Sequence, residues 1–135
     1  DQGYLAAIVL RAMHRFPECA EVQDAGCQVV AYACDRYEGA RQVAASSGTT
    51  VILRAFQRSV TRDRLTSDSG DRCTYLAAIS SLGRLSSATG AAMLVLSKSR
   101  IVLDLELAME NEEDPHVLES LLRIVLNLLP SMICE

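Results

Sequence analysis

The sequence has no tryptophan and few other aromatic residues: two phenylalanines and four tyrosines among 135 residues. A core must therefore be built from alanine, leucine, valine and isoleucine, which suits closely packed helices better than a β-sandwich. The chain also lacks any long glycine-, proline- or serine-rich tract. Half of its residues are apolar and 22% are charged, which excludes a disordered chain. We expect one domain spanning residues 1–135.

Other absences exclude functional classes. The net charge is −4 and no basic stripe is present, which argues against nucleic acid as a partner. No apolar run reaches the roughly 18 residues of a membrane span, and no signal peptide is visible, so we expect an intracellular, cytoplasmic protein. The sequence has no phosphate loop, GxSxG or HExxH motif, so we expect no enzyme and no cofactor. Because the chain starts at Asp1 without a methionine, we expect it to be excised from a longer chain.

The cysteines are odd in number, lack a CxxC motif and stand among apolar residues: Cys19, Cys27, Cys34, Cys73 and Cys134. This pattern predicts reduced thiols in an intracellular protein. Cys27 and Cys34 are seven residues apart, the spacing of a core stripe on one helix face. His14 and His116 are far from any carboxylate cluster with ligand spacing. We therefore expect no bound metal.

The spacing of apolar residues and the positions of proline, glycine and polar turns predict helices and no strands. Thr49 is predicted to cap the fourth helix, and Pro130 to end the last one. The polar stretch 59–71 is predicted to be a loop insertion, either a plain solvated loop or a partner contact or phosphorylation site. The expected helices span approximately residues 3–16, 19–34, 39–46, 50–58, 72–86, 91–96, 100–110 and 116–129.

The helices repeat along the chain. Ala12-Met13, Ala55-Phe56 and Ala108-Met109 each close a helix, at spacings of 43 and 53 residues. In the long helix that follows each of them, Gly26, Ala78 and Leu121 align at spacings of 52 and 43. The extra length falls in the second unit, where the polar stretch 59–71 lies. We predict three units, approximately 3–37, 38–87 and 88–130, the first without its short helix.

The three long helices contain VQDAGCQVVAYAC, DRCTYLAAISSLGRLS and HVLESLLRIVLNLLP. The opening VQDAGC and the closing LNLL resemble the third helix of the armadillo repeat family, with HEAT repeats as near neighbours. The resemblance implies an all-α, right-handed α-solenoid of stacked armadillo/HEAT-like repeats; a compact irregular helical bundle is the alternative. In the first long helix we expect inward packing of Ala25, Gly26, Val29, Val30 and Ala33.

The resemblance also implies a binding surface. In armadillo proteins two positions on the third helix, four residues apart, face an extended peptide, and in the nuclear-import members they are often Trp and Asn. Asn127 alone keeps the family residue, so basic import signals are disfavoured, whereas two arginines favour an acidic or phosphorylated segment. The alternative is that these positions are simply the solvated side of the helices, with Tyr32 partly buried. We call the six positions the ladder: Gln28, Tyr32, Ser80, Arg84, Arg123 and Asn127.

Three functional hypotheses follow. The first is a scaffold or adaptor module that binds a protein or peptide along the concave groove. The second is a structural module that self-assembles into a homo-oligomer through apolar end helices, and the third is a regulatory domain of a larger multidomain protein. The acidic stretch 104–114 is expected to be a solvated ridge, or a docking patch for a basic partner. The apolar end surface would comprise Leu118, Leu121, Leu122, Val125, Met132 and Ile133.

Overall fold

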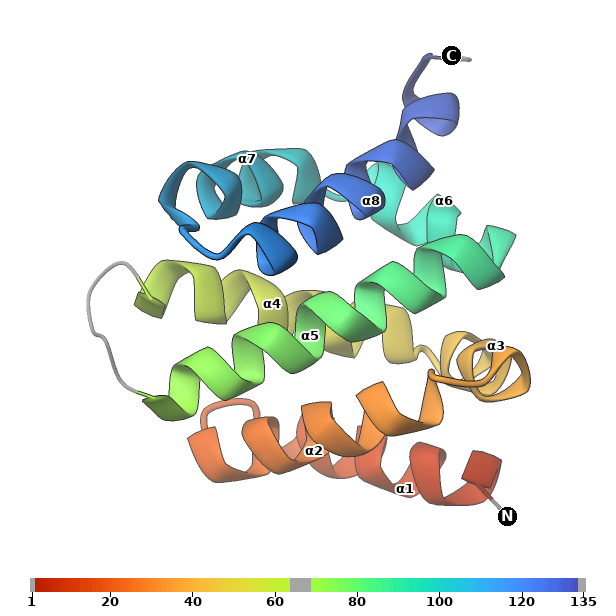
Figure 1. Ribbon diagram of the computed structural model, residues 1–135. Helices are drawn as coiled ribbons and strands as arrows, with labels where there is room; N and C mark the ends of the chain where they lie inside the picture. The colour runs from red at the N-terminus through yellow and green to blue at the C-terminus, as the bar shows by residue number, and fades with distance from the viewer. Residues whose placement is uncertain (1, 64–68, 134–135) are drawn as a thin grey trace.

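The computed structural model describes residues 2–63 and 69–133, and these form eight α-helices and no β-strand (Figure 1). The predicted all-α class is confirmed for these residues. The helices are α1 (Gln2–Arg15), α2 (Ala20–Ala33), α3 (Tyr37–Ala45), α4 (Gly48–Asp63), α5 (Ser69–Ala88), α6 (Gly90–Lys98), α7 (Ile101–Asn111) and α8 (Pro115–Ile133).

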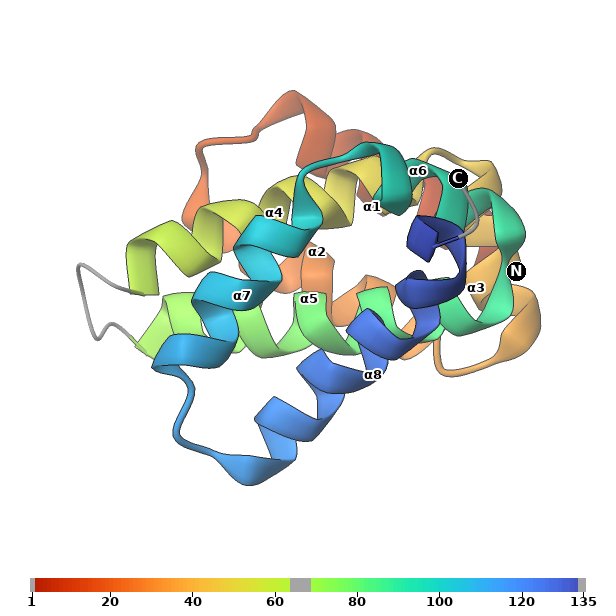
Figure 2. The same cartoon turned by 90° about the horizontal axis from the view of Figure 1, so that it is seen from above.

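The helices lie in three layers, with α1 and α2 at the bottom of Figure 1, α4 and α5 in the middle, and α7 and α8 at the top. Between layers, α2 packs on α5 and α5 on α8, while α1 packs on α4 and α4 on α7. The short helices α3 and α6 lie at one end of the layers. Figure 2 shows that α8 crosses α5 obliquely, so the two helices diverge towards the start of α8.

The core is aliphatic, as the shortage of aromatic residues predicted. It forms one cluster of buried side chains that includes Leu10, Ile52, Leu82 and Leu128, and so runs through all three layers. Two aromatic residues of the middle layer stack on each other, Phe56 on α4 and Tyr75 on α5, with ring centroids 6.0 Å apart. Small and branched side chains let helices approach closely, which explains why so few aromatic residues suffice.

Two glycines allow the close contacts that α3 makes with the end of α2 and with the start of α4. A Cβ on Gly39 would collide with the backbone carbonyl of Ala33. A Cβ on Gly48 would lie 2.6 Å from the carbonyl oxygen of Val43. Gly48 begins α4, and Ser47 before it takes the left-handed turn conformation with a φ of 62°.

Three predicted boundaries were wrong. Thr49 does not cap α4; it lies inside the helix, 2% exposed, and its hydroxyl has no hydrogen-bond partner. Both α4 and α5 extend into the stretch 59–71 expected to be a loop, of which residues 64–68 lie outside the described part. Finally, α8 continues through Pro130 to Ile133, because a proline there removes only one hydrogen bond of the last turns.

The burial of single residues also differs from prediction. Gly26, Val30 and Ala33 pack inward as predicted, but Ala25 is exposed and Val29 is 36% exposed. The reason is that α2 has α1 and α5 as neighbours but lies at the bottom of the stack, so one of its sides stays open. Conversely, Leu121 was expected on an exposed end surface and is fully buried against the layer below.

Candidate functional site

Helices α2, α5 and α8, which carry the ladder, lie on the near side of the molecule in Figure 1. Spacing of four residues places each pair of ladder positions on one side of its helix. Gln28, Ser80, Arg84 and Arg123 are exposed, and Asn127 is half-buried. Tyr32 is 78% exposed, so the interpretation of this side chain as partly buried was wrong.

Four ladder residues line one hollow between α5 and α8. Its volume is about 480 Å³. The side chains of Ile79 and Leu126 contribute apolar surface, and Gly83 leaves room between the two helices. Gln28 and Tyr32 lie on α2, outside the residues that line this hollow. The polar lining residues are Ser80, Arg84 and Ser87 from α5, and Ser120, Arg123 and Asn127 from α8.

A smaller hollow of about 190 Å³ extends the first one towards the start of α8. The two share Ile79, Ser80 and Ser120, and the smaller one adds Leu76, His116 and Val117. We call the two together the α5–α8 groove. Along α5 the groove runs from Leu76 to Ser87, which corresponds to about 16 Å at a helical rise of ~1.5 Å per residue. An extended peptide of about five residues has that length.

The two groove arginines each have an acidic neighbour. Arg84 Nη2 lies 3.2 Å from Oδ1 of Asp35, which follows α2. Arg123 Nε lies 3.2 Å from Oε1 of Glu119, one turn earlier on α8. All four side chains are more than half exposed. Exposed pairs of this kind stabilise a protein little, so a ligand carboxylate or phosphate can replace either acid at small cost.

Asn127 serves the packing of the two helices. Its Nδ2 donates to Oγ of Ser86 on α5 at 3.0 Å, and Ser86 in turn donates to the carbonyl of Gly83 at 3.1 Å. Ser86 is buried. One hydrogen of the Asn127 amide is therefore used between α5 and α8, on the floor of the groove.

The ladder residues on α2 lie in a different setting. Gln28 donates to Oδ1 of Asp24 at 3.1 Å, and Thr74 on α5 donates to the same oxygen at 3.3 Å. Asp24 thus joins α2 to α5 beside the ladder. The exposed ring of Tyr32 stands further along α2. The structure therefore divides the ladder into four residues at one groove and two on the neighbouring layer.

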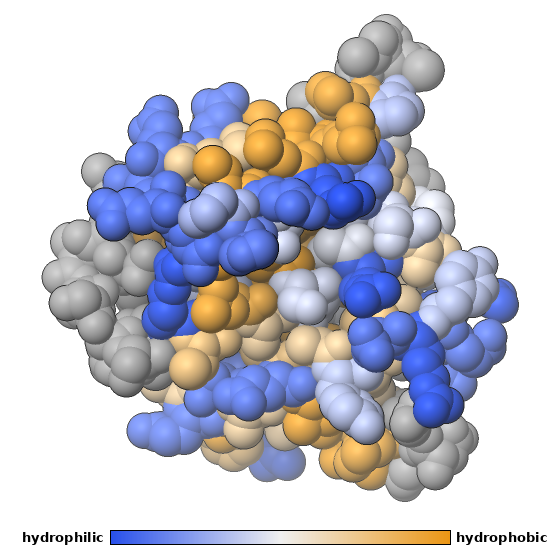
Figure 3. Space-filling view, in the orientation of Figure 1, coloured by the Kyte–Doolittle hydropathy of each residue, from blue (hydrophilic) through white to orange (hydrophobic). Residues whose placement is uncertain are grey.

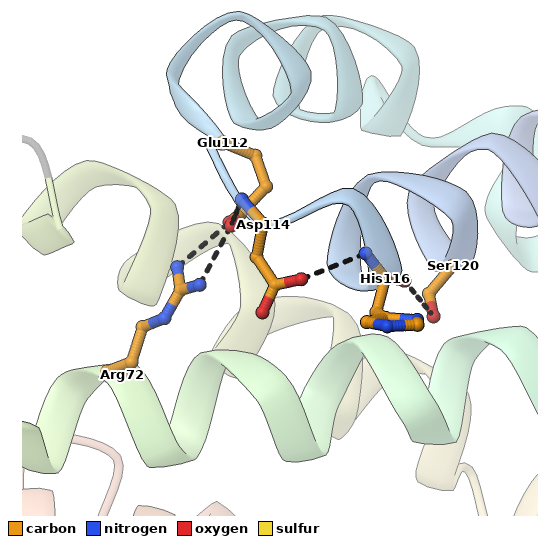
Figure 4. A network of polar contacts seen from close by, with 5 residues as sticks. All are labelled: Arg72, Glu112, Asp114, His116 and Ser120. Carbon is orange, nitrogen blue, oxygen red and sulfur yellow. Dashed lines mark hydrogen bonds and ion pairs between the residues drawn. The ribbon is translucent and has the colours of Figure 1, made fainter.

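A polar network that the sequence did not reveal joins the middle and top layers (Figure 4). Arg72 at the start of α5 donates two hydrogen bonds of 2.8 Å to the carboxylate of Glu112, whose side chain is 3% exposed. The same carboxylate accepts from the backbone N–H of Asp114 at 2.9 Å, and Asp114 accepts from the N–H of His116 at the start of α8. Because 40 residues separate Arg72 from Glu112, no local pattern could indicate this pair.

The network changes the interpretation of the acidic stretch 104–114. Glu112 is an interior ion-pair partner, and Asp104 accepts a hydrogen bond of 2.8 Å from Gln57 on α4. Glu106, Glu110, Glu113 and Asp114 remain exposed. The stretch is therefore a solvated ridge only in part.

The cysteines within the described chain form no disulfide: Cys19, Cys27, Cys34 and Cys73 are free. Burial raises the pKa of the Cys27 thiol to about 12, with a further contribution from Asp24. Burial also raises the pKa of Cys34 to about 12, although nearby Arg84 opposes the shift. Over residues 2–63 and 69–133, no three metal-ligating side chains gather as a metal site would require.

None of the helices in the described part of the chain has both the length and the apolar character to span a membrane. Comparisons of the sequence with models of protein families, with curated proteins and with solved structures found no match.

Proposed function

We propose that this chain is a non-enzymatic protein-interaction module, an armadillo-like stack that binds an extended acidic or phosphorylated segment of a partner protein in the α5–α8 groove. The α2, α5 and α8 helices are the counterparts of the third armadillo helices in this proposal. The short helices α3 and α6 each precede a longer pair, and α1–α2 has no short helix before it within the described residues. That order of helices supports the proposal of stacked repeat units.

The observation that carries the proposal is the composition of the larger hollow. Its lining includes Arg84 and Arg123, three serine hydroxyls and the Asn127 amide, and no lining residue is acidic. Arginine presents several N–H donors in a planar fork that matches a carboxylate or phosphate. Ser80 adds a hydroxyl donor, whereas Ser87 and Ser120 donate to the carbonyls of Arg84 and His116, so their oxygens can accept from a peptide N–H. The groove therefore offers positive charge and hydrogen-bond donors along a path of about five extended residues.

The absence of an acid–base pair favours binding over catalysis. Among the described residues, no histidine, cysteine, aspartate or glutamate lines the larger hollow, and His116 is the one such residue lining the smaller hollow. General acid–base and nucleophilic catalysis both need such groups, usually held in an enclosed pocket with an altered pKa. A shallow groove with two exposed arginines provides anchoring points for a chain instead.

The test uses three libraries of short synthetic peptides of random sequence. One library has a fixed phosphoserine, one a fixed glutamate and one a fixed lysine, and binding to the purified chain is measured by fluorescence anisotropy. We expect binders in the phosphoserine and glutamate libraries, with affinities that fall as salt increases. Equal enrichment in the lysine library, or no binder in any library, would overturn the proposal.

Charge reversal locates the site. We expect Arg84→Glu together with Arg123→Glu to weaken the selected peptides at least about tenfold, the equivalent of ~1.4 kcal/mol. The matched control is Arg41→Glu with Arg54→Glu, which makes the same change of charge at exposed positions of α3 and α4, away from the groove. If both double variants lose affinity equally, the effect is one of overall charge and the groove is not the site.

A further inference from the structure

The top of the stack exposes an apolar stripe on α8. Leu118, Leu122, Val125 and Leu129 follow one another at helical spacing, on the side of α8 away from the groove residues. Leu122 is 52% exposed and Leu129 is 37% exposed, while Leu118 and Val125 are half-buried. Leu103 on the neighbouring α7 is 54% exposed. Figure 3 shows the apolar surface that results over α8.

The bottom of the stack also exposes apolar side chains. Leu5 and Ile8 on α1 are 54% and 41% exposed, and Val29 on α2 is 36% exposed. Apolar surface is visible along the lower edge of the molecule in Figure 3, where α1 and α2 lie. Exposed apolar surface gathered on a face commonly marks an interaction site. The molecule therefore has two apolar end faces, one at each end of its layers.

The two end faces carry opposite charges on corresponding helices. In the described part of α1, Arg11 and Arg15 are exposed and no residue is acidic. In α7, Glu106 and Glu110 are exposed and no residue is basic. The other helix of each end adds exposed Glu21 at the bottom, whereas the exposed Glu119 and Arg123 of α8 pair with each other beside the groove. Complementary charge thus concentrates on the α1 and α7 edges.

The orientation of the helices matches this complementarity. In Figure 1, α1 and α7 both run from right to left, in the bottom and top layers on the same side of the stack. Figure 2 shows that α7 is turned relative to α1, so a second copy displaced along the stack and rotated with this turn would place its α1 over α7 in the same direction. Arg11 and Arg15, in the second half of α1, would then lie over Glu106 and Glu110, in the second half of α7.

We propose that the chain self-associates head to tail, the α1–α2 face of one copy docking on the α7–α8 face of the next. The apolar side chains would supply the buried area, and the arginine–glutamate pairs would set the direction. Such an interface joins two different surfaces. An assembly of any length therefore keeps one free face at each of its ends and can grow beyond a dimer. The α5–α8 groove faces sideways and takes no part in this contact.

Light scattering coupled to size-exclusion chromatography tests the proposal. We expect the mean mass of the wild-type chain to rise continuously with concentration, past the mass of a dimer. Ile8→Glu removes the lower face and Leu122→Glu removes the upper face, so each variant alone should be monomeric. An equimolar mixture of the two should form a dimer and nothing larger, because each partner retains the face that the other has lost.

Several outcomes would overturn the proposal. A wild-type monomer at every concentration would show that these faces do not join copies of the chain. A two-fold symmetric contact through α8 would leave Ile8→Glu dimeric and would stop the mixed variants from pairing. Tyr37→Glu is the matched control, since Tyr37 on α3 is 63% exposed and belongs to neither face. It should associate like the wild type, and unchanged circular dichroism and urea midpoints will show that all three variants fold.

Charge exchange tests the direction of the contact. Arg11→Glu with Arg15→Glu should weaken self-association at least about tenfold at low salt. Adding Glu106→Arg and Glu110→Arg in the same chain should restore it. If the reversed pairs fail to restore association, the two edges do not meet. Arg84→Glu with Arg123→Glu should leave the masses unchanged, which separates this interface from the peptide groove.

Discussion

Removal of the carboxylate of Glu112 should destabilise the contact between the middle and top layers. Two charge-assisted hydrogen bonds of 2.8 Å join it to Arg72, and its side chain is 3% exposed. The guanidinium of Arg72 also lies 5.3 Å from the ring centroid of Tyr75, which stacks on Phe56 in the core. The pair is thus attached to the core on one side and to the start of α8 on the other.

The expected magnitude follows from the unequal exposure of the two partners. Hydrogen bonds to charged groups contribute roughly 1.5–3 kcal/mol each, and loss of one partner deprives the other of both of these hydrogen bonds. Arg72 is 35% exposed and can recover hydration, so we expect Glu112→Gln to cost about 2 kcal/mol. Arg72→Leu leaves a buried carboxylate, so we expect it to cost about 3 kcal/mol or more. The double variant should cost less than the sum of the two.

The effect should also depend on pH. The hydrogen bonds from Arg72 lower the pKa of Glu112 below its ordinary value of 4.5, more than burial raises it. A carboxyl group whose pKa is lower in the folded state stabilises the fold fully above its unfolded pKa. It loses that contribution as the pH falls through the folded pKa. The difference between the wild type and Glu112→Gln should therefore be complete at neutral pH and shrink below pH 4.5.

Urea unfolding followed by circular dichroism measures these differences. For a domain of this size 1 kcal/mol corresponds to about 3 °C in the melting temperature, which a thermal scan can check. Glu119→Gln is the matched control, because it removes an exposed partner of Arg123 and should change stability by no more than about 0.5 kcal/mol. Equal, small effects of the two glutamine variants, or a Glu112 effect that does not change in acid, would refute the reasoning.

Three further substitutions and one labelling reaction test the fold. Gly39→Ala should destabilise the fold by about 2 kcal/mol or more, because the added methyl group meets a backbone carbonyl at the end of α2. Gly83 has open space around it, so Gly83→Ala should stabilise α5 by about 0.5–1 kcal/mol. Urea unfolding measures both changes. Thr89→Ala removes the hydroxyl that caps α6 by accepting a 2.9 Å hydrogen bond, and should lower the free energy of unfolding by about 1 kcal/mol. In thiol labelling of the native protein at mildly alkaline pH, exposed Cys73 should react readily, and Cys27, whose pKa is raised to about 12, should react only in denaturant.

The candidate site could be anticipated in part. The alignment of long helices indicated Ser80, Arg84, Arg123 and Asn127 as one surface, and these four residues line the same groove. It gave no sign that Asp35 and Glu119 stand beside the two arginines, or that Asn127 bonds to Ser86. Side-chain partners of this kind depend on the angle at which α8 crosses α5, which no spacing within either helix specifies.

The sequence by itself determined the helical class and most of the helices, because helix formation depends on local features: apolar spacing, propensity and the placement of proline and glycine. It also determined the aliphatic character of the core. The tertiary structure alone decided which sides of those helices are covered, so that Val29 is exposed at the bottom of the stack and Leu121 is buried beneath the top. It alone paired Arg72 with Glu112 and left the α5–α8 groove between two layers. Burial and pairing depend on neighbours distant in the chain, and those neighbours are set by how the layers pack.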